Sequence, residues 1–176
     1  MPPLAFSIGA MYGGDFFDRL ALADEVFQRW GAELLARPGI ASALRELAAE
    51  AEGLGGLMAG LGMGESCARC GARSGGGCCG VAMAGENDGF QLLMNRLAGR
   101  ELTPIRDDGV ECFFLGPAGC ALLFKPMFCL NYLCQGLRKG LTPEAAAVLE
   151  RRTGLLLQRQ HGLECLLHDA CRALSR

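Results

Sequence analysis

Apolar residues recur at helical spacing in the first third of the chain. From Asp15 to Arg37 they fall every three or four positions, which predicts one amphipathic helix that a Pro-Gly pair should end. A second helical pattern covers residues 42–52 and is expected to dissolve where a run of glycines begins at Gly53. The two patterns together predict a helical hairpin over residues 1–52.

The glycine-rich stretch that follows has no clear period. Residues 53–85 contain the first four cysteines, and the pattern predicts a loop that something other than packing must organise. After it, Phe90 to Leu97 places its apolar residues on one face and predicts a short helix, for which Asp88 is the expected N-cap.

Two apolar runs between Val110 and Phe124 are separated by the turn-forming residues 116–119. This arrangement predicts a short β-hairpin. Its strands would present Cys112 and Cys120 near the turn.

The last part of the chain again has a helical pattern. Thr142, followed by a proline and a glutamate, is a good helix start, and the pattern continues towards Ala173 with potential breaks at Gly154 and Gly162. No repeat or linker divides the chain, so we expect a single domain over residues 1–176.

The predicted fold class is therefore mainly α. It is a small helical domain with the hairpin at residues 1–52, a cysteine-rich metal-binding core with a short β-hairpin at 53–136, and a C-terminal helix at 141–176.

Charge and hydropathy narrow the range of partners. The net charge of -2, from 17 basic and 19 acidic residues, gives no broad attraction for nucleic acid or for an anionic membrane. No stretch approaches the ~20 uninterrupted apolar residues of a membrane-spanning helix, and the N-terminal residues do not read as a signal peptide. We therefore expect a cytoplasmic protein with no nucleic-acid or membrane partner.

Ten cysteines are unusual for such a protein. In a reducing compartment structural disulfides are rare, and thiolates remain free to bind metal. Cysteines that only fill a core would be scattered, whereas eight of these ten are clustered. The predicted ligands are Cys67, Cys70, Cys78, Cys79, Cys112, Cys120, Cys129 and Cys134.

Cys67 and Cys70 form a CxxC pair, a spacing that lets two thiolates bind one metal. A thioredoxin-like redox pair has the same spacing, but the glycine-rich sequence before Cys67 does not fit the strand that precedes such a pair. Adjacent side chains point apart in extended backbone, so Cys78 and Cys79 are expected to serve different sites, or one to bind and the other to pack.

The cysteine pattern between Cys67 and Cys134 resembles the bacterial YkgJ-type family of zinc- or iron-chelating proteins. That family has a CxxC-x-CC opening and a later block of four cysteines. The later block corresponds here to Cys112-Phe-Phe-Leu, then Cys120, Lys-Pro, and Cys129-Leu-Asn-Tyr-Leu-Cys134. All eight cysteine positions are matched.

The surroundings of those cysteines depart from the family pattern. The gap before Cys78 is longer, and Lys125 and Leu130 stand where the family has arginines. The resemblance implies binding of zinc or an iron-sulfur cluster by these eight thiols and says little about a reaction.

Other candidate residues have simpler interpretations. Cys165, His168 and Cys171 share one helix face and form a conceivable ligand set, but core packing is favoured. Arg69, Arg73 and Lys125 lie near thiolates in sequence and would neutralise a cluster, although ordinary surface charge is favoured. His161 is expected to face solvent.

Three functions remain open. The first is a metal or cluster carrier, sensor or structural metalloprotein. The second is an iron-sulfur enzyme or electron-transfer protein, and flagellin lysine methylase, with a similar cysteine pattern, is a much larger relative of that kind. The third is a zinc-stapled module that binds a protein partner. No nucleophile-histidine-acid arrangement or phosphate loop supports another chemistry.

Overall fold

The computed structural model describes residues 6–73 and 77–175. Helices dominate these residues, and a two-stranded antiparallel sheet is also present. The helices are η1 (Ile8–Met11), α1 (Phe16–Ala36), α2 (Pro38–Gly60), α3 (Met63–Gly71), η2 (Val81–Glu86), α4 (Gly89–Leu97), α5 (Met127–Asn131), α6 (Gln135–Arg138) and α7 (Pro143–Leu174). The strands are β1 (Leu115–Gly116) and β2 (Gly119–Cys120). The predicted mainly helical fold with a short β-hairpin is confirmed to this extent.

Helix α1 begins where the sequence predicts. The Asp15 carboxylate accepts a hydrogen bond from the Asp18 N-H at 2.9 Å, and Asp18 in turn accepts one from the Asp15 N-H at 3.0 Å. This capping box satisfies two amide groups that would otherwise lack partners at the helix start. Pro38 then occupies the first turn of α2, so the two helices are separated by a single residue.

The predicted end of the second helix at Gly53 is wrong. Helix α2 continues to Gly60, because Ala51 and Leu54 are buried in the core and this packing outweighs a cost of about 0.5 to 1 kcal/mol for each helical glycine. The chain turns only at Gly62, whose φ of +65° is a left-handed conformation that suits glycine.

The loop predicted for residues 53–85 is therefore wrong over most of its length. It contains the last turns of α2, all of α3 and all of η2 except its last residue, Glu86. Residues 74–76 of that segment lie outside the described residues, as do residues 1–5 of the expected hairpin and residue 176.

Helix α4 and the C-terminal helix are confirmed. The Asp88 carboxylate accepts a hydrogen bond from the Gln91 N-H at 2.8 Å and caps α4, while Thr142 caps α7. The breaks considered at Gly154 and Gly162 do not occur, since α7 is continuous.

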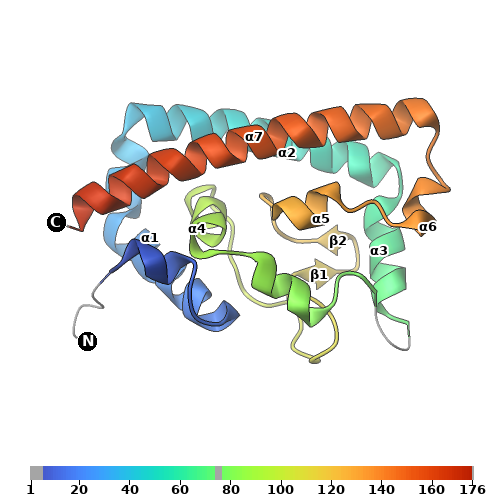
Figure 1. Cartoon of the computed structure of the whole chain (residues 1–176), viewed down its shortest axis with the longest axis horizontal. Helices are drawn as coiled ribbons and strands as arrows, with labels where there is room; N and C mark the ends of the chain where they lie inside the picture. The colour runs from blue at the N-terminus through green and yellow to red at the C-terminus, as the bar shows by residue number, and fades with distance from the viewer. Residues whose placement is uncertain (1–5, 74–76, 176) are drawn as a thin grey trace.

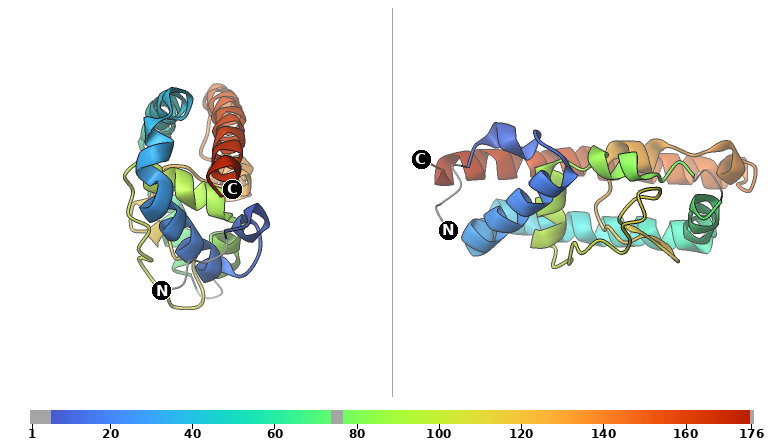
Figure 2. Two further views of the ribbon diagram at one scale, coloured as in Figure 1. Left: turned by 90° about the vertical axis from the view of Figure 1, so that its left-hand side faces the viewer. Right: turned by 90° about the horizontal axis from the view of Figure 1, so that it is seen from below.

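The long helices α2 and α7 lie side by side along the molecule (Figure 1). Arg159 of α7 pairs with Glu50 of α2 at 3.0 Å and approaches Glu46 at 3.8 Å. Viewed end on, the two helices stand next to each other and α1 and α4 lie beneath them (Figure 2). Helices α1 and α4 pack closely, with Arg96 of α4 bound to Asp24 of α1 at 2.7 Å.

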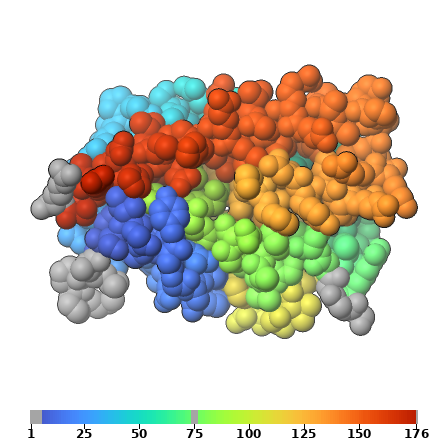
Figure 3. Space-filling model, viewed as in Figure 1, coloured from blue at the N-terminus to red at the C-terminus, as the bar shows by residue number. Residues whose placement is uncertain are grey.

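The cysteine-bearing segments gather beside α2 and α7, away from the C-terminal end of α7 (Figure 1). On the face shown in Figure 3, residues of η2 (green) and of α5 (orange) adjoin one another. Buried residues from α1, α2, α4, the hairpin, α5 and α7 form one continuous core, so the cysteine-rich part shares its packing with the long helices. None of the helices within the described ranges is both long and apolar enough to cross a membrane.

Candidate metal centre

Helix α3 carries the first two candidate ligands. Cys67 and Cys70 are three residues apart and therefore share one helix face. The backbone of α3 touches the hairpin turn, since a Cβ at Gly64 would overlap the carbonyl group of Ala118. Only a glycine allows this approach, which brings Cys67 towards the strands. The expectation that the CxxC pair lies in a loop is thus corrected.

A short backbone pairing brings the next cysteines to Cys112. The Cys112 N-H donates to the Cys79 carbonyl at 2.7 Å, and the Val81 N-H donates to the Val110 carbonyl at 2.9 Å. Gly80 and Glu111 form an antiparallel bridge between these two bonds. Residues 33 positions apart in sequence are thereby held together.

The β-hairpin and α5 supply the remaining ligands. Cys120 lies in β2, opposite Leu115 of β1, and Gly119 before it has a φ of +106° that requires glycine. Cys129 lies in α5 and Cys134 is the N-cap residue of α6.

Asn95 of α4 fixes the chain between Cys120 and Cys129. Its side chain is fully buried, and its carbonyl oxygen accepts hydrogen bonds from the N-H groups of Leu123 at 2.9 Å and Phe124 at 3.0 Å. Its amide nitrogen donates to the carbonyls of Phe124 and Gln91, both at 2.9 Å. One side chain thus meets three backbone groups of a segment that has no regular structure of its own, and a fourth within α4. The sequence analysis did not identify Asn95, although an asparagine within an apolar helix is a signal for such a role.

These elements enclose one cavity of about 400 Å³. Six of the eight candidate cysteines line it, namely Cys67, Cys78, Cys79, Cys112, Cys120 and Cys129. Apolar residues such as Met63, Leu115 and Leu122 complete much of the wall. Cys70 and Cys134 are half-buried and do not line the cavity. All ten cysteines are free thiols.

The environment of the thiols differs from one cysteine to the next. A hydrogen bond with the Cys79 thiol lowers the pKa of Cys67 to about 7, and the same interaction raises the pKa of Cys79. Burial raises the pKa of Cys112 and is the main cause that raises the pKa of Cys129 to about 12. Burial also raises the pKa of Cys120, although part of this residue is exposed at the surface.

The cysteines also shift one another's pKa values, and these effects divide the thiols into two connected groups. After burial, the charges that raise the pKa of Cys78 are those of Cys67, Cys134 and Cys70, which defines a first group of four. After burial, the pKa of Cys129 is raised by Cys120 and Cys112, which defines a second group of three. Cys79 lies between the two groups, because its pKa is raised by Cys67 and Cys78 and, more weakly, by Cys129.

Lys125 is the basic residue of this wall that acts on the thiols. It is half-buried, it lines the cavity, and its charge opposes the burial-induced rise in the pKa of Cys120 and Cys129. This position favours charge neutralisation at the thiols over the ordinary surface charge that the sequence analysis preferred. Arg69 instead lies at the surface, where it pairs with Glu65 at 3.6 Å.

The donor set fits a soft or borderline metal, because thiolates are the preferred ligands of zinc and of iron-sulfur clusters. The side chains surround the cavity and do not meet at one point. Among the described residues, no three histidine, cysteine or carboxylate side chains are grouped closely enough to hold an ion as they stand. Binding would therefore draw thiols inward from the cavity wall.

The three residues of α7 considered as a further ligand set do not act together. Cys171 is fully buried, as expected for core packing. The His168 ring packs against Phe90, with centroids 6.1 Å apart, and its Nδ1 faces the Asp169 carboxylate at 3.4 Å. Cys165 is exposed, which is at odds with a packing role.

Comparison with known proteins identifies no similar protein from which a function could be inferred. No family model matches the chain, and neither a curated protein nor a solved structure matches it. The function is therefore inferred from the residues of the chain and their geometry.

Proposed function

We propose that this chain is a cytoplasmic metal-binding protein that holds zinc or an iron-sulfur cluster through clustered cysteine thiolates, in a carrier, sensor or structural role. One observation carries the proposal: six cysteines from α3, the segment after it, the segment before β1, β2 and α5 line the same cavity. Free cysteines that served only as small apolar side chains would not be expected to gather around a cavity. The resemblance of the cysteine spacing to the YkgJ-type family supports the same conclusion.

The eight thiols would bind in two sets of four. The first set is Cys67, Cys70, Cys78 and Cys134, and the second is Cys79, Cys112, Cys120 and Cys129. Four sulfurs satisfy either a structural zinc ion or an iron-sulfur cluster. Adjacent Cys78 and Cys79 then belong to different sets, as expected for neighbouring side chains that point apart.

The other residues of the wall have separate tasks. The bound metal would supply Lewis acidity if it is zinc, or electron transfer if it is a cluster. Lys125 would offset part of the negative charge that several thiolates accumulate. Leu115, Leu122 and Leu130, each almost fully buried, would limit access of water to the sulfurs.

A second candidate function is an iron-sulfur enzyme. The cavity volume of about 400 Å³ lies within the range of about 300 to 1,000 Å³ that is typical of small-molecule sites. A centre held on one wall would leave room for a substrate beside Phe128 and Tyr132, whose rings are stacked 5.7 Å apart.

Purification without oxygen, followed by a visible absorption spectrum and metal analysis, tests the proposal. A brown chromophore with iron and sulfide would identify a cluster, and colourless protein with stoichiometric zinc would identify a zinc site. The double variant Cys70→Ser/Cys134→Ser should lose the metal of the first set alone, and Cys112→Ser/Cys120→Ser that of the second. Cys171→Ala is the matched control, because this thiol is buried in the core away from the cavity. Wild-type protein that folds yet takes up no zinc, iron or sulfide would refute the proposal.

A further inference from the structure

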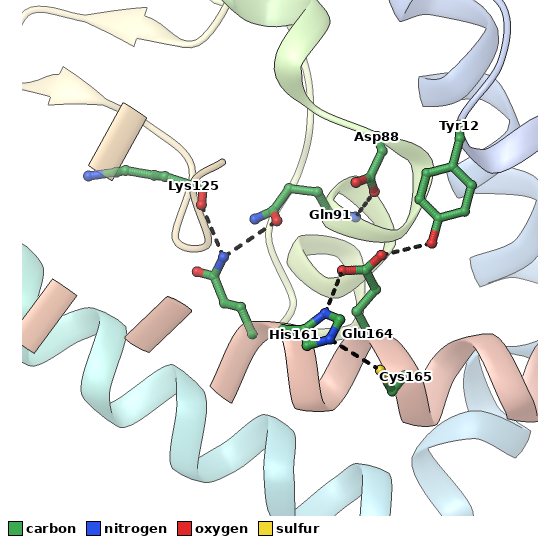
Figure 4. A network of polar contacts seen from close by, with 8 residues as sticks. Tyr12, Asp88, Gln91, Lys125, His161, Glu164 and Cys165 are labelled. Carbon is green, nitrogen blue, oxygen red and sulfur yellow. Dashed lines mark hydrogen bonds and ion pairs between the residues drawn. The ribbon is translucent and has the colours of Figure 1, made fainter. Parts of the chain in front are cut away.

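A histidine and a cysteine, two residue types that can bind metals, lie close together on α7, outside the cysteine-lined cavity. His161 and Cys165 are four residues apart on this helix and therefore face each other across one turn. Their Nε2 and Sγ atoms are 3.8 Å apart, and both residues are exposed (Figure 4). A tetrahedral zinc ion with bonds of about 2.0 Å to nitrogen and 2.3 Å to sulfur brings such a pair to a similar separation.

The opposite side of the imidazole faces a carboxylate. His161 Nδ1 lies 3.9 Å from Glu164 Oε2, so a proton on Nδ1 would leave the Nε2 lone pair directed towards Cys165. Metal-bound histidines in proteins commonly donate their second ring N-H to a carboxylate, and a small movement of Glu164 towards His161 would form such a hydrogen bond here.

A tyrosine from a distant part of the chain holds that carboxylate. The Tyr12 hydroxyl, just after η1, donates a hydrogen bond of 2.7 Å to Glu164 Oε1 (Figure 4). Burial and this bond raise the pKa of Tyr12 far above its usual value, which keeps the hydroxyl a donor. The Tyr12 ring also packs on Phe90, with centroids 5.7 Å apart, so the support of Glu164 comes from the folded core.

We propose that His161 and Cys165 form an open surface site for a divalent transition-metal ion of the Zn²⁺ class. Glu164 and Tyr12 are positioning residues that orient the imidazole. On binding, a bond forms from the metal to the Cys165 sulfur, and the thiol proton passes to solvent. Two coordination positions remain for water or an external ligand, which makes the ion exchangeable. The site does not depend on the proposed central metal, because it shares no side chain with the cavity wall.

His168, one turn further along, is not part of this pair. Its ring nitrogen faces Asp169, and its ring packs on Phe90. The described residues offer no third ligand already in place at His161 and Cys165, so affinity should be modest compared with that of a four-thiolate site.

Alkylation of Cys165 by iodoacetamide tests the proposal in the full-length chain. The rate is measured by mass spectrometry of the peptide that contains Cys165, in EDTA and at increasing Zn²⁺. Zn²⁺ should slow the reaction by roughly tenfold or more in the wild type, and His161→Gln should abolish this protection. Glu164→Gln should raise the Zn²⁺ concentration for half-protection by roughly tenfold, because Glu164 acts through the imidazole.

Buried Cys171 serves as the internal reference, since its slow alkylation shows that each variant remains folded. Zinc or iron bound to the central cysteines is measured in the same samples. If that content is unchanged while Zn²⁺ fails to protect Cys165, the surface site is absent and the main proposal is unaffected. Absence of Zn²⁺ protection at Cys165 in the wild type, or equal protection in His161→Gln, would overturn the inference.

Discussion

Single side chains hold the candidate metal centre in shape, and Asn95 is the clearest case. Three of its hydrogen bonds tie α4 to the irregular segment between Cys120 and Cys129. A backbone group that loses its partner in the core costs about 1 to 3 kcal/mol. The geometry of two candidate ligands thus depends on a residue that itself binds no metal.

Asn95→Ala should lower the free energy of unfolding by on the order of 3 kcal/mol and reduce metal content, because the N-H groups of Leu123 and Phe124 lose their acceptor. Urea denaturation and metal analysis measure the two effects. Asn131→Ala is the matched control at an exposed position of α5 and should change stability by less than about 0.5 kcal/mol. Equal effects of the two substitutions would contradict the role given to Asn95.

Asp88 should make stability depend on pH. Burial is the main cause that raises its pKa above 3.8, so the folded state holds this proton more tightly than the unfolded state. The resulting stabilisation is present below the ordinary pKa and is lost as the pH rises through the raised folded value. Asparagine caps a helix as well as aspartate does and carries no charge.

Asp88→Asn should therefore equal or exceed the wild type in unfolding free energy at neutral pH, with a difference that shrinks as the pH falls towards about 4. Asp88→Ala, which removes the cap of α4, should instead cost about 1 kcal/mol. Urea denaturation across this pH range measures both variants. A difference in unfolding free energy between Asp88→Asn and the wild type that does not change with pH would show that the pKa of Asp88 is not raised in the folded state.

At the scale of elements, helix α3 packs so closely against the hairpin that the contact leaves no room for a side chain at residue 64. Gly64 touches Ala118 and Gly119, and a Cβ at residue 64 would overlap the Ala118 carbonyl. In contrast, a Cβ at Gly56 of α2 would meet nothing within 4 Å. An added side chain would therefore be tolerated at Gly56 and not at Gly64, although the local sequence does not distinguish these two helical glycines.

Gly64→Ala should destabilise the protein by about 1 to 3 kcal/mol and move Cys67 away from the strands, with loss of metal. Gly56→Ala is the matched control and should stabilise it by about 0.5 to 1 kcal/mol, because alanine favours a helix. Thermal denaturation with metal analysis of both variants checks the contrast. A Gly64→Ala protein as stable and as metal-rich as Gly56→Ala would show that the contact is not needed.

The elements with strong local signals were predictable from the sequence. Periodicity and caps predicted α1, α4 with Asp88 as its cap, the hairpin and the start of α7 at Thr142. The segment from Gly53 to Gly71 was misjudged, since burial of Leu54 on the core cannot be seen from local composition. The clustering of eight cysteines is visible in the sequence, but the arrangement of six of them around one cavity arises from tertiary contacts such as those of Gly64 and Asn95.

For the whole molecule, the distribution of packing implies uneven stability. Helices α2 and α7 are packed together with core residues from both ends of the chain, whereas the cysteine-bearing segments after α2 consist of short elements joined by irregular chain. A structural thiolate site can contribute on the order of 10 kcal/mol to folding. The metal should therefore stabilise the cavity region more than the long helices.

Chelation should raise amide exchange first in α3 and in residues 77–86 and 120–136, while α2 and α7 remain protected. Hydrogen exchange measured by mass spectrometry before and after complete metal removal makes the comparison, with the amides of α7 as the reference. The sequence predicted a loop organised by something other than packing from Gly53 onward, and the structure restricts such a region to residues after α2. Equally slow exchange in both states would mean that packing alone orders the centre.

Helix α7, 32 residues and therefore about 48 Å long, also bears on the order of assembly. It reaches α2, α4 and α5, so the last residues of the chain complete a frame that the first helices begin. If the proposed metal binds in the cavity, it would enter a frame that the long helices have already formed. Maturation would then be a late event, separate from synthesis and governed by the supply of metal.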